Sequence, residues 1–252
     1  MEWRKKPVPE PELSIVVPCY NEEGNIPGLI ERFARTLAGN QAIELVLVDN
    51  GSTDTTGALI EREIKTREMS RARKVLVPKN QGYGFGILSG LREARGNVLA
   101  WTHADLQTDP ADVLKAYDLY RKEAAGATPV MVKGRRIRRG LAEAFFSWGM
   151  QTTASLALGC KVTEINAQPK LFPRAFLKEL DNAPHDFSLD LFALYRARKS
   201  GYRILELPVD FAARKSGEAK GGSGSSWSVR GKLIKRTFCY IFELRRKIRQ
   251  GA

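Results

Sequence analysis

Short apolar runs alternate with amphipathic stretches along the first half of the chain. The apolar runs are continuous and rich in β-branched residues, as in parallel strands buried on both faces, and they lie at 13–17, 43–49, 74–77, 97–101 and 130–133. The segments between them have the apolar spacing of helices, at 25–37, 54–67, 84–94 and 109–125. This alternation predicts an α/β fold with a mostly parallel, doubly wound central sheet flanked by helices.

The second half is less regular. It has helical patterns at 141–158 and 189–199 and short strand patterns at 170–172 and 203–211. A Gly/Ser-rich segment, predicted to be a mobile loop, is followed by a stretch with helical spacing. We therefore expect a leader at 1–12, an α/β domain at 13–213, a mobile loop at 214–226 and a basic amphipathic tail helix at 227–252.

Polar residues follow four of the predicted strands. The runs are PCYNEE from position 18, DNGSTD from 49, HADLQ from 103 and GRR from 134. Ligands of doubly wound sheets bind beyond the carboxyl ends of the strands, so these runs predict one polar cleft at that edge.

Composition narrows the class of protein. Three widely separated cysteines argue against a disulfide framework and indicate a reducing compartment. The presence of only two histidines argues against a histidine-based metal cluster. The first residues lack a signal-peptide core, and no apolar run is long enough to span a membrane, which indicates a soluble or peripheral protein. The net charge of +13 is concentrated at 133–139 and in the tail, which favours a polyanionic partner.

Four motifs together resemble the inverting glycosyltransferases of family 2. They are VPCYNEE at 17–23, VDNGSTD at 48–54, HADLQ at 103–107 and RKSGEAK at 214–220. The nearest branch is that of the dolichol- and polyprenyl-phosphate hexose (mannose) synthases. The resemblance implies a GT-A (Rossmann-like) fold and transfer of a sugar from a nucleoside diphosphate sugar to a polyprenyl phosphate at the cytoplasmic face of a membrane.

The resemblance assigns the nucleoside to the first two loops. The implied contacts are Pro18, Tyr20, Glu22, Val48, Asp49 and Asn50. An aromatic ring can pack on a base, and a carboxylate can accept hydrogen bonds from ring N–H groups or ribose hydroxyls. For Gly51 and Asp54 we favour a structural role, in a turn and as a helix N-cap respectively.

The resemblance assigns a divalent ion to Asp105 and Gln107. Oxygen ligands suit Mg²⁺ or Mn²⁺, which take further ligands from the diphosphate. His103, which replaces an acidic residue of the family, and Ala104 count among the donor-binding positions. His103 can ligate Mn²⁺, hydrogen-bond the donor sugar, or stand at the strand end without contacting the metal. Asp109 and Pro110 are expected to begin a helix.

Cations are expected to offset the charge of the leaving diphosphate. The family's arginine and lysine positions correspond to Arg135, Arg214 and Lys220, which we count as catalytic candidates. Arg136, Arg138 and Arg139 are expected instead to form a solvated or lipid-facing edge.

The acceptor side leaves alternatives open. Gln168 and Lys170 are expected to face the donor sugar or the acceptor. A phosphate acceptor needs no base, whereas a hydroxyl of a glycan or glycolipid does, and Asp190 or Asp186 is then the candidate. A third alternative is a sugar-nucleotide-binding scaffold without activity.

The tail carries eight Lys or Arg and one Glu, a net charge of +7. As a helix it places apolar residues on one broad face and basic residues opposite, which suits an anionic membrane surface. The alternative is a helix packed on the domain. A nucleic-acid partner would explain the charge but not the strand-end motifs, so we expect none. The sequence gives no indication of the oligomeric state.

Overall fold

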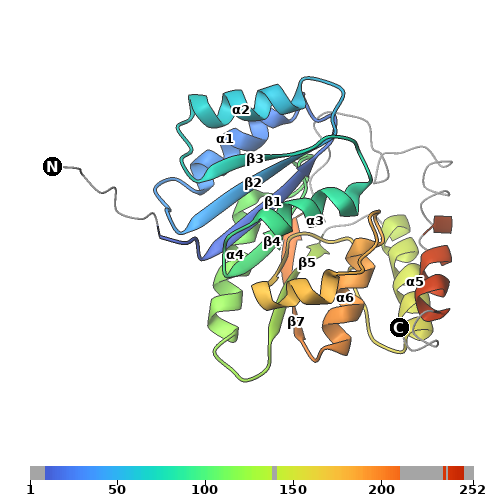
Figure 1. Cartoon of the computed structure of the whole chain (residues 1–252). Helices are drawn as coiled ribbons and strands as arrows, with labels where there is room; N and C mark the ends of the chain where they lie inside the picture. Colours follow the sequence, from blue (N-terminus) through green and yellow to red (C-terminus); the bar gives the residue numbers. More distant parts are fainter. Residues whose placement is uncertain (1–8, 138–140, 211–234, 237, 247–252) are drawn as a thin grey trace.

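The computed structural model describes residues 9–137, 141–210, 235–236 and 238–246. It contains a seven-stranded sheet in the order β3-β2-β1-β4-β6-β5-β7, in which only the pairings of β6 are antiparallel (Figure 1). The strands are β1 (Leu13–Cys19), β2 (Ile43–Asn50), β3 (Ala72–Val77), β4 (Val98–Trp101), β5 (Val130–Ile137), β6 (Lys170–Pro173) and β7 (Arg203–Asp210). The prediction of a mostly parallel sheet flanked by helices is confirmed.

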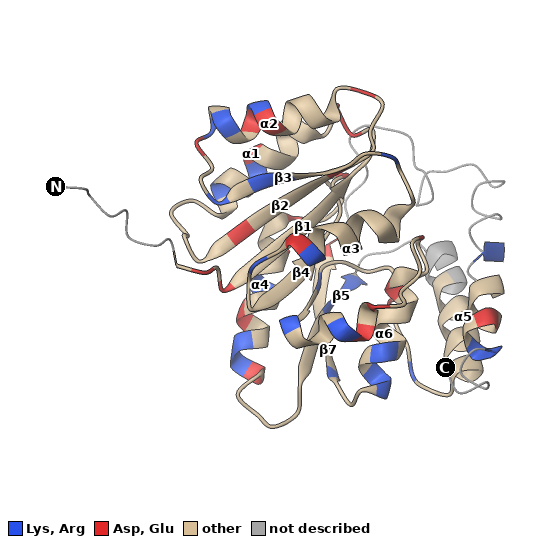
Figure 2. Ribbon diagram, in the orientation of Figure 1, with Lys and Arg blue, Asp and Glu red and all other residues tan. Residues whose placement is uncertain are grey.

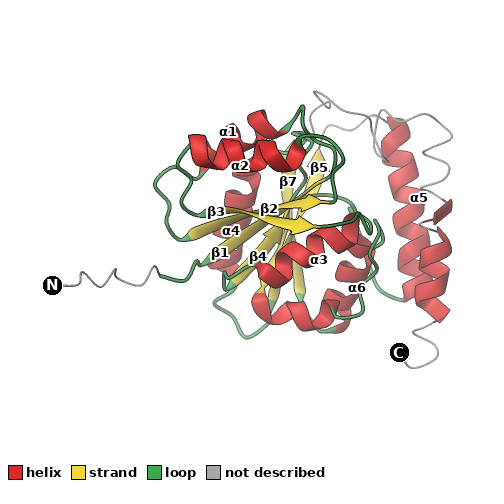
Figure 3. Cartoon of the chain, turned by 45° about the horizontal axis from the view of Figure 1, so that its top comes forward, coloured by secondary structure: helices red, strands yellow, loops and turns green. Residues whose placement is uncertain are grey.

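Helices connect the strands and cover both faces of the sheet (Figures 1 and 3). The structure places them at α1 (Ile26–Thr36), α2 (Thr56–Thr66), α3 (Tyr83–Glu93), α4 (Pro110–Glu123), α5 (Leu141–Leu158), the 3-10 helix η1 (Arg174–Leu180) and α6 (Leu189–Lys199). None of the described helices is long and apolar enough to cross a membrane.

Alternate residues of each central strand enter two separate cores. On β1, Ile15 and Val17 pack with α1 and α4, whereas Val16 packs with the core that includes α3 and α6. Every residue of β2 is also buried, so exposed polar residues do not alternate with buried apolar residues along this strand. This two-sided burial explains the continuous apolar runs in the sequence.

Strand β5 is longer than predicted. Its predicted end was residue 133, but parallel pairing with β7 continues through Ile137, opposite Asp210. Arg135 and Arg136 are therefore strand residues rather than part of a loop, and their side chains take different environments.

The antiparallel strand β6 brings its first residues to the carboxyl edge of the parallel strands. Lys170 pairs with Trp101 at the end of β4 and with Lys133 of β5. A parallel strand would have placed its last residues there, so the reversal puts the segment before β6 beside the ends of β4 and β5.

The described part of the tail is helical and packs on the domain. Ile241 and Leu244 are buried in the core that contains α5 and α6, while Phe242 is 54% exposed. Figure 3 shows this segment alongside α5, at the side of the molecule away from β3. The predicted leader, except for residues 9–12, and the predicted loop at 214–226 lie outside the described residues.

Candidate active site

A cavity of about 380 Å³ opens at the carboxyl edge of the sheet. Its walls come from the segments after β1, β2 and β4, the start of α3, the end of β5, the loop before β6 and the start of α6. Nine of the predicted site residues line it: Pro18, Tyr20, Glu22, Asn50, His103, Ala104, Asp105, Gln107 and Asp190. The strand-end segments thus meet in one place.

Hydrogen bonds between the first two loops hold one wall of the cavity. Asn21 has a left-handed backbone (φ 51°), and its N–H donates to Ser52 Oγ over 3.1 Å. The Glu22 N–H donates to Thr56 Oγ1 at 2.8 Å. These bonds fix the backbone at Asn21 and Glu22, and Tyr20 and Glu22 line the cavity.

Asn50 stands at the end of β2 and is only 2% exposed. Its Nδ2 donates to Gly82 O at 3.0 Å, whereas its Oδ1 has no hydrogen-bond partner among the described residues. A Cβ on Gly86 would lie 2.7 Å from Asn50 Cγ, so glycine is needed there to admit the amide. Asn50 therefore presents a buried acceptor at the cavity, where a ligand N–H or O–H can satisfy it.

Val48 and Asp49 lie beside the cavity rather than in its lining. Val48 packs in the core against α3, where a Cβ on Gly90 would lie 2.6 Å from its Cγ2. Asp49 Oδ1 accepts from the Ser52 N–H at 3.0 Å, which stabilises the following turn.

The turn role expected for Gly51 is confirmed, whereas the N-cap of α2 is Thr55 rather than Asp54. Gly51 has φ 72° in the turn, and Asp54 Oδ1 accepts from Thr56 N at 3.0 Å at the start of α2.

A kinked turn after β4 presents Asp105 and Gln107 to the cavity. Leu106 between them has a left-handed backbone (φ 61°), and its side chain packs in the core beside α1. Asp105 Oδ1 accepts from the Gln107 N–H at 3.1 Å. The kink buries the apolar residue and leaves the carboxylate and the amide on the cavity side. As predicted, Asp109 caps α4 through Ala111 N, and Pro110 begins the helix.

Three rings stack along another wall. The Tyr83 ring lies 5.8 Å from the His103 ring and 4.6 Å from the Phe187 ring, measured between centroids. Burial lowers the pKa of His103, although Asp105 and Asp190 oppose this shift. Burial, with Asp190 and Asp105, raises the pKa of Tyr83, so its hydroxyl keeps its proton and can donate a hydrogen bond.

The two arginines of β5 point in different directions. Arg136 lines the cavity, is 18% exposed and lies 3.6 Å from Glu164. The expectation that it faces solvent is wrong, because β5 continues past residue 133 and carries the side chain inward. Arg135 is 48% exposed and lies 3.7 Å from Glu206. Arg214 and Lys220 lie outside the described residues.

Gln168 and Lys170 are buried and hydrogen-bond to Asp190, which itself reaches the cavity. Their functional groups thus contact another candidate residue.

Six further lining residues were not identified from the sequence as site residues: Cys19, Asn80, Gly82, Tyr83, Asn166 and Phe187. The spacing of Gly82, Gly84 and Gly86 is the signal that could have found Tyr83. A Cβ on Gly82 or Gly84 would lie 2.4 or 2.5 Å from backbone carbonyl oxygens of the segment before α6. Close backbone approach at these glycines brings Tyr83 against Phe187.

Sequence comparison identifies a family. The model of "Glycosyl transferase family 2" matches residues 14–181. A dodecaprenyl-phosphate galacturonate synthase from Rhizobium johnstonii is 31% identical over 97% of this chain and 71% of its own length. An undecaprenyl-phosphate 4-deoxy-4-formamido-L-arabinose transferase from Pseudomonas aeruginosa is 37% identical, but the match spans 43% of this chain and 32% of that protein.

Solved structures share the fold. Glucosyl-3-phosphoglycerate synthase from Mycobacterium tuberculosis superposes with a TM-score of 0.71 at 18% identity, covering 93% of this chain and 79% of its own. The same enzyme has been solved with Mn²⁺ and UDP. A mannosyltransferase from Pyrobaculum calidifontis, in complex with GDP-Man and Mn²⁺, has a TM-score of 0.62 at 23% identity, covering 84% of this chain and 59% of its own.

Proposed function

The chain belongs to glycosyl transferase family 2, and from this premise we propose that it transfers a sugar from a nucleoside diphosphate sugar to a polyprenyl phosphate. The observation that carries the proposal is the convergence of the strand-end motifs on one cavity at the carboxyl edge of the sheet. The names of both sequence relatives support the acceptor, since each specifies a polyprenyl phosphate.

The nucleoside would bind along the wall formed by Tyr20, Glu22 and Asn50. The tyrosine ring offers a face for a base, and Glu22 offers acceptors for ring N–H or ribose hydroxyl groups. The buried Oδ1 of Asn50 would gain the partner that the described residues do not supply.

Asp105 and Gln107 fit a divalent ion that is shared with the diphosphate. The described residues include no group of three or more His, Cys, Asp or Glu side chains able to enclose a metal. Mg²⁺ and Mn²⁺ suit such an open site, because they bind through one or two carboxylates and complete their shell with phosphate oxygens and water. When bound, the ion would neutralise charge on the departing diphosphate.

The chain's own cations would stabilise the same charge. Arg136 reaches the cavity, and we retain Arg135, Arg214 and Lys220 as further candidates on the basis of the resemblance. A polyprenyl phosphate is already an anionic nucleophile, so its oxygen can attack the anomeric carbon in line, with inversion and without a general base.

A hydroxyl acceptor is the second candidate, because Asp190, a possible base, also lines the cavity. A scaffold without activity is the third, and turnover of any donor excludes it.

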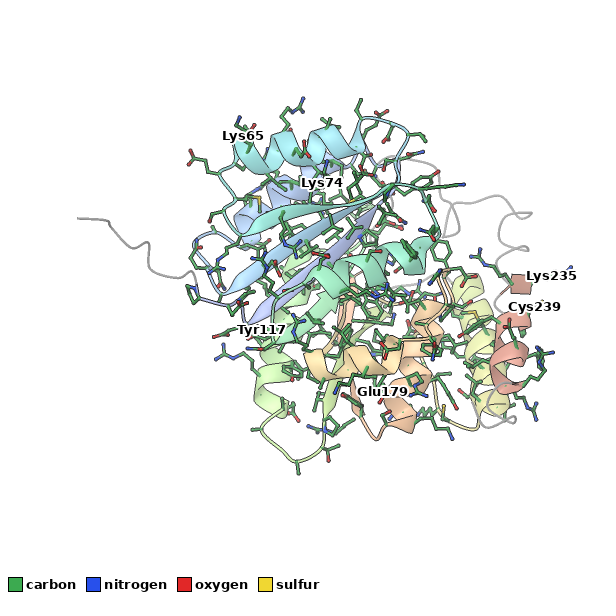
Figure 4. All side chains as sticks on the ribbon, in the orientation of Figure 1. Lys65, Lys74, Tyr117, Glu179, Lys235 and Cys239 are labelled. Atoms are coloured by element: carbon green, nitrogen blue, oxygen red, sulfur yellow. The ribbon has the colours of Figure 1, made fainter. Side chains whose placement is uncertain are left out.

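We also propose that the protein works as a peripheral protein at the cytoplasmic face of a membrane. Trp148 and Leu156 of α5 are 63% and 79% exposed, and Phe242 of the tail is also exposed. Figure 2 shows Lys and Arg at both ends of the described tail helix, and Figure 4 shows Lys235 at the outer edge of the molecule. Apolar residues near cations suit an anionic bilayer surface. The three free cysteines agree with a reducing compartment.

A melting-temperature panel with UDP, GDP, CDP and dTDP, each with Mn²⁺, tests the donor side. One nucleotide at about 100 times its Kd should add about 2.7 kcal/mol, which raises the Tm by about 5 °C or more. Asp105→Ala should lose the Mn²⁺-dependent part of this shift. Asp109→Ala is the control, since it removes a helix cap outside the cavity, and it should keep the shift at a lower starting Tm. The proposal fails if none of the four nucleotides stabilises the protein.

A further inference from the structure

Lys170 is a fully buried ammonium group whose donors are all in use. Its side chain is 0% exposed, and its three N–H groups meet Ile165 O at 2.9 Å, Ala167 O at 3.2 Å and Asp190 Oδ1. An ammonium has three donors and no acceptor. Lys170 therefore has no donor left for a sugar or a phosphate.

Gln168 is committed in the same way. Its Nε2 donates to Asp190 Oδ1 at 3.0 Å and to the Tyr83 hydroxyl at 3.3 Å, which uses both N–H groups. Gln168 lies just before β6, and Lys170 is the first residue of this strand. Together they fix the carboxylate of Asp190, which lies in the first turn of α6.

This arrangement ties the Asp190 carboxylate to a buried cation. Lys170 and Asp190 form an ion pair in which the side chains are 0% and 2% exposed. Removing one partner of a buried ion pair is strongly unfavourable, because the other charge remains desolvated. The two side chains therefore depend on each other, and the pair fixes the position of the carboxylate.

Asp190 nevertheless reaches the cavity. Both hydrogen bonds from Lys170 and Gln168 end on Oδ1, and the Tyr83 hydroxyl also hydrogen-bonds to this carboxylate. A carboxylate has about four lone-pair sites, so Oδ2 keeps acceptor capacity for a ligand in the cavity. The Tyr83 hydroxyl, also in the lining, lies next to this group through its bond with Gln168.

We propose that Asp190 determines donor specificity: its Oδ2 accepts a hydrogen bond from a hydroxyl of the donor sugar, and Lys170 and Gln168 are positioning residues that hold the carboxylate in place. This inference rests on the proposed function and deepens it.

Asp190→Asn tests the inference, with Asp181→Asn as the matched control, because Asp181 is exposed and lies outside the cavity lining. Calorimetric titration in Mn²⁺ compares UDP with UDP-galacturonic acid and GDP with GDP-mannose. For the pair that the wild-type protein binds, Asp190→Asn should weaken the sugar nucleotide about ten-fold or more and leave the nucleoside diphosphate unchanged. In transfer assays the donor KM should rise by a similar factor while kcat changes less than about three-fold.

Two results would overturn the inference. One is equal affinity of both proteins for the sugar nucleotide. The other is a kcat about 100-fold lower with KM unchanged, which is the signature of a lost base. If the wild-type protein binds none of UDP, GDP, CDP and dTDP, the proposed function itself fails.

A stability measurement covers the case in which the single variant does not fold. Lys170→Met alone should lower the Tm more than Lys170→Met combined with Asp190→Asn, since the double variant leaves no unpaired buried charge. The folded double variant then serves for the titrations. Additive Tm changes would show that the two side chains do not depend on each other.

Discussion

Lys133 is a charged residue enclosed by the sheet, only 2% exposed, with its Nζ 2.9 Å from Glu206 Oε1. Burial lowers its pKa to about 8, and Glu206 only partly offsets this shift. The same pair joins the middle of β5 to β7, and Arg135 and Arg136 follow on β5.

This pKa predicts how stability changes with pH. Between about 8 and 10.5 the unfolded chain keeps the Lys133 proton that the folded chain has lost, so the free energy of unfolding should rise with pH in this window. The rise is on the order of 3 kcal/mol, at 1.36 kcal/mol for each pKa unit. Urea denaturation at several pH values should show it in the wild-type protein and in Lys178→Met, an exposed-lysine control, but not in Lys133→Met. An identical pH slope in all three proteins would contradict the prediction.

At the level of single residues, the sequence predicted those site positions that follow directly from strand ends. Tyr20, Asn50 and Asp105 line the cavity because parallel strands in one sheet end at one edge. Tyr83 and Phe187 escaped prediction because their meeting depends on the close approach of α3 to the segment before α6, which is a contact between distant parts of the chain.

At the level of elements, the apolar pattern predicted every described strand, but not the reach of β5 or the direction of β6. Both depend on pairing partners: β7 extends β5 through Ile137, and the place of β6 between β4 and β5 fixes its direction. The orientation of Arg136 follows from this pairing and could not be read from local spacing. Similarly, glycine is a residue type typical of loops, yet Gly134 lies within β5. A Cβ at this position would lie 2.1 Å from Gln168 O.

The tail helix divides its apolar residues between two environments, and this division predicts two different mutant effects. Ile241→Ala removes a fully buried side chain and should cost about 2–5 kcal/mol of stability. Phe242→Ala should change stability by no more than about 0.5 kcal/mol, because the ring is already exposed, but should weaken binding to anionic vesicles.

Chemical denaturation and vesicle co-sedimentation of both variants separate the two roles of the tail. Vesicles of neutral lipid provide the control, on which both proteins should bind weakly. If Phe242→Ala sediments like the wild-type protein on anionic vesicles, this face of the tail does not contact lipid.

At the level of the whole molecule, the tail contacts a segment that borders the cavity at the carboxyl edge of the sheet. The Arg236 guanidinium lies 5.3 Å from the centre of the Phe187 ring and 3.5 Å from Asp186, so the tail touches the segment that forms the cavity rim. The basic amphipathic character of the tail was predictable from sequence. Its packing was not, because two apolar residues inside one helix turn can face either the core or a membrane.

The most direct test of the account is a transfer assay with two matched acceptors, undecaprenyl phosphate and undecaprenol. Each is incubated with labelled UDP-galacturonic acid or GDP-mannose and Mn²⁺, and the organic phase is then counted. We predict label in the lipid only with undecaprenyl phosphate, with inverted anomeric configuration and with no product from Asp105→Ala. Transfer to undecaprenol, or release of label only into water while undecaprenyl phosphate is present, would contradict the account.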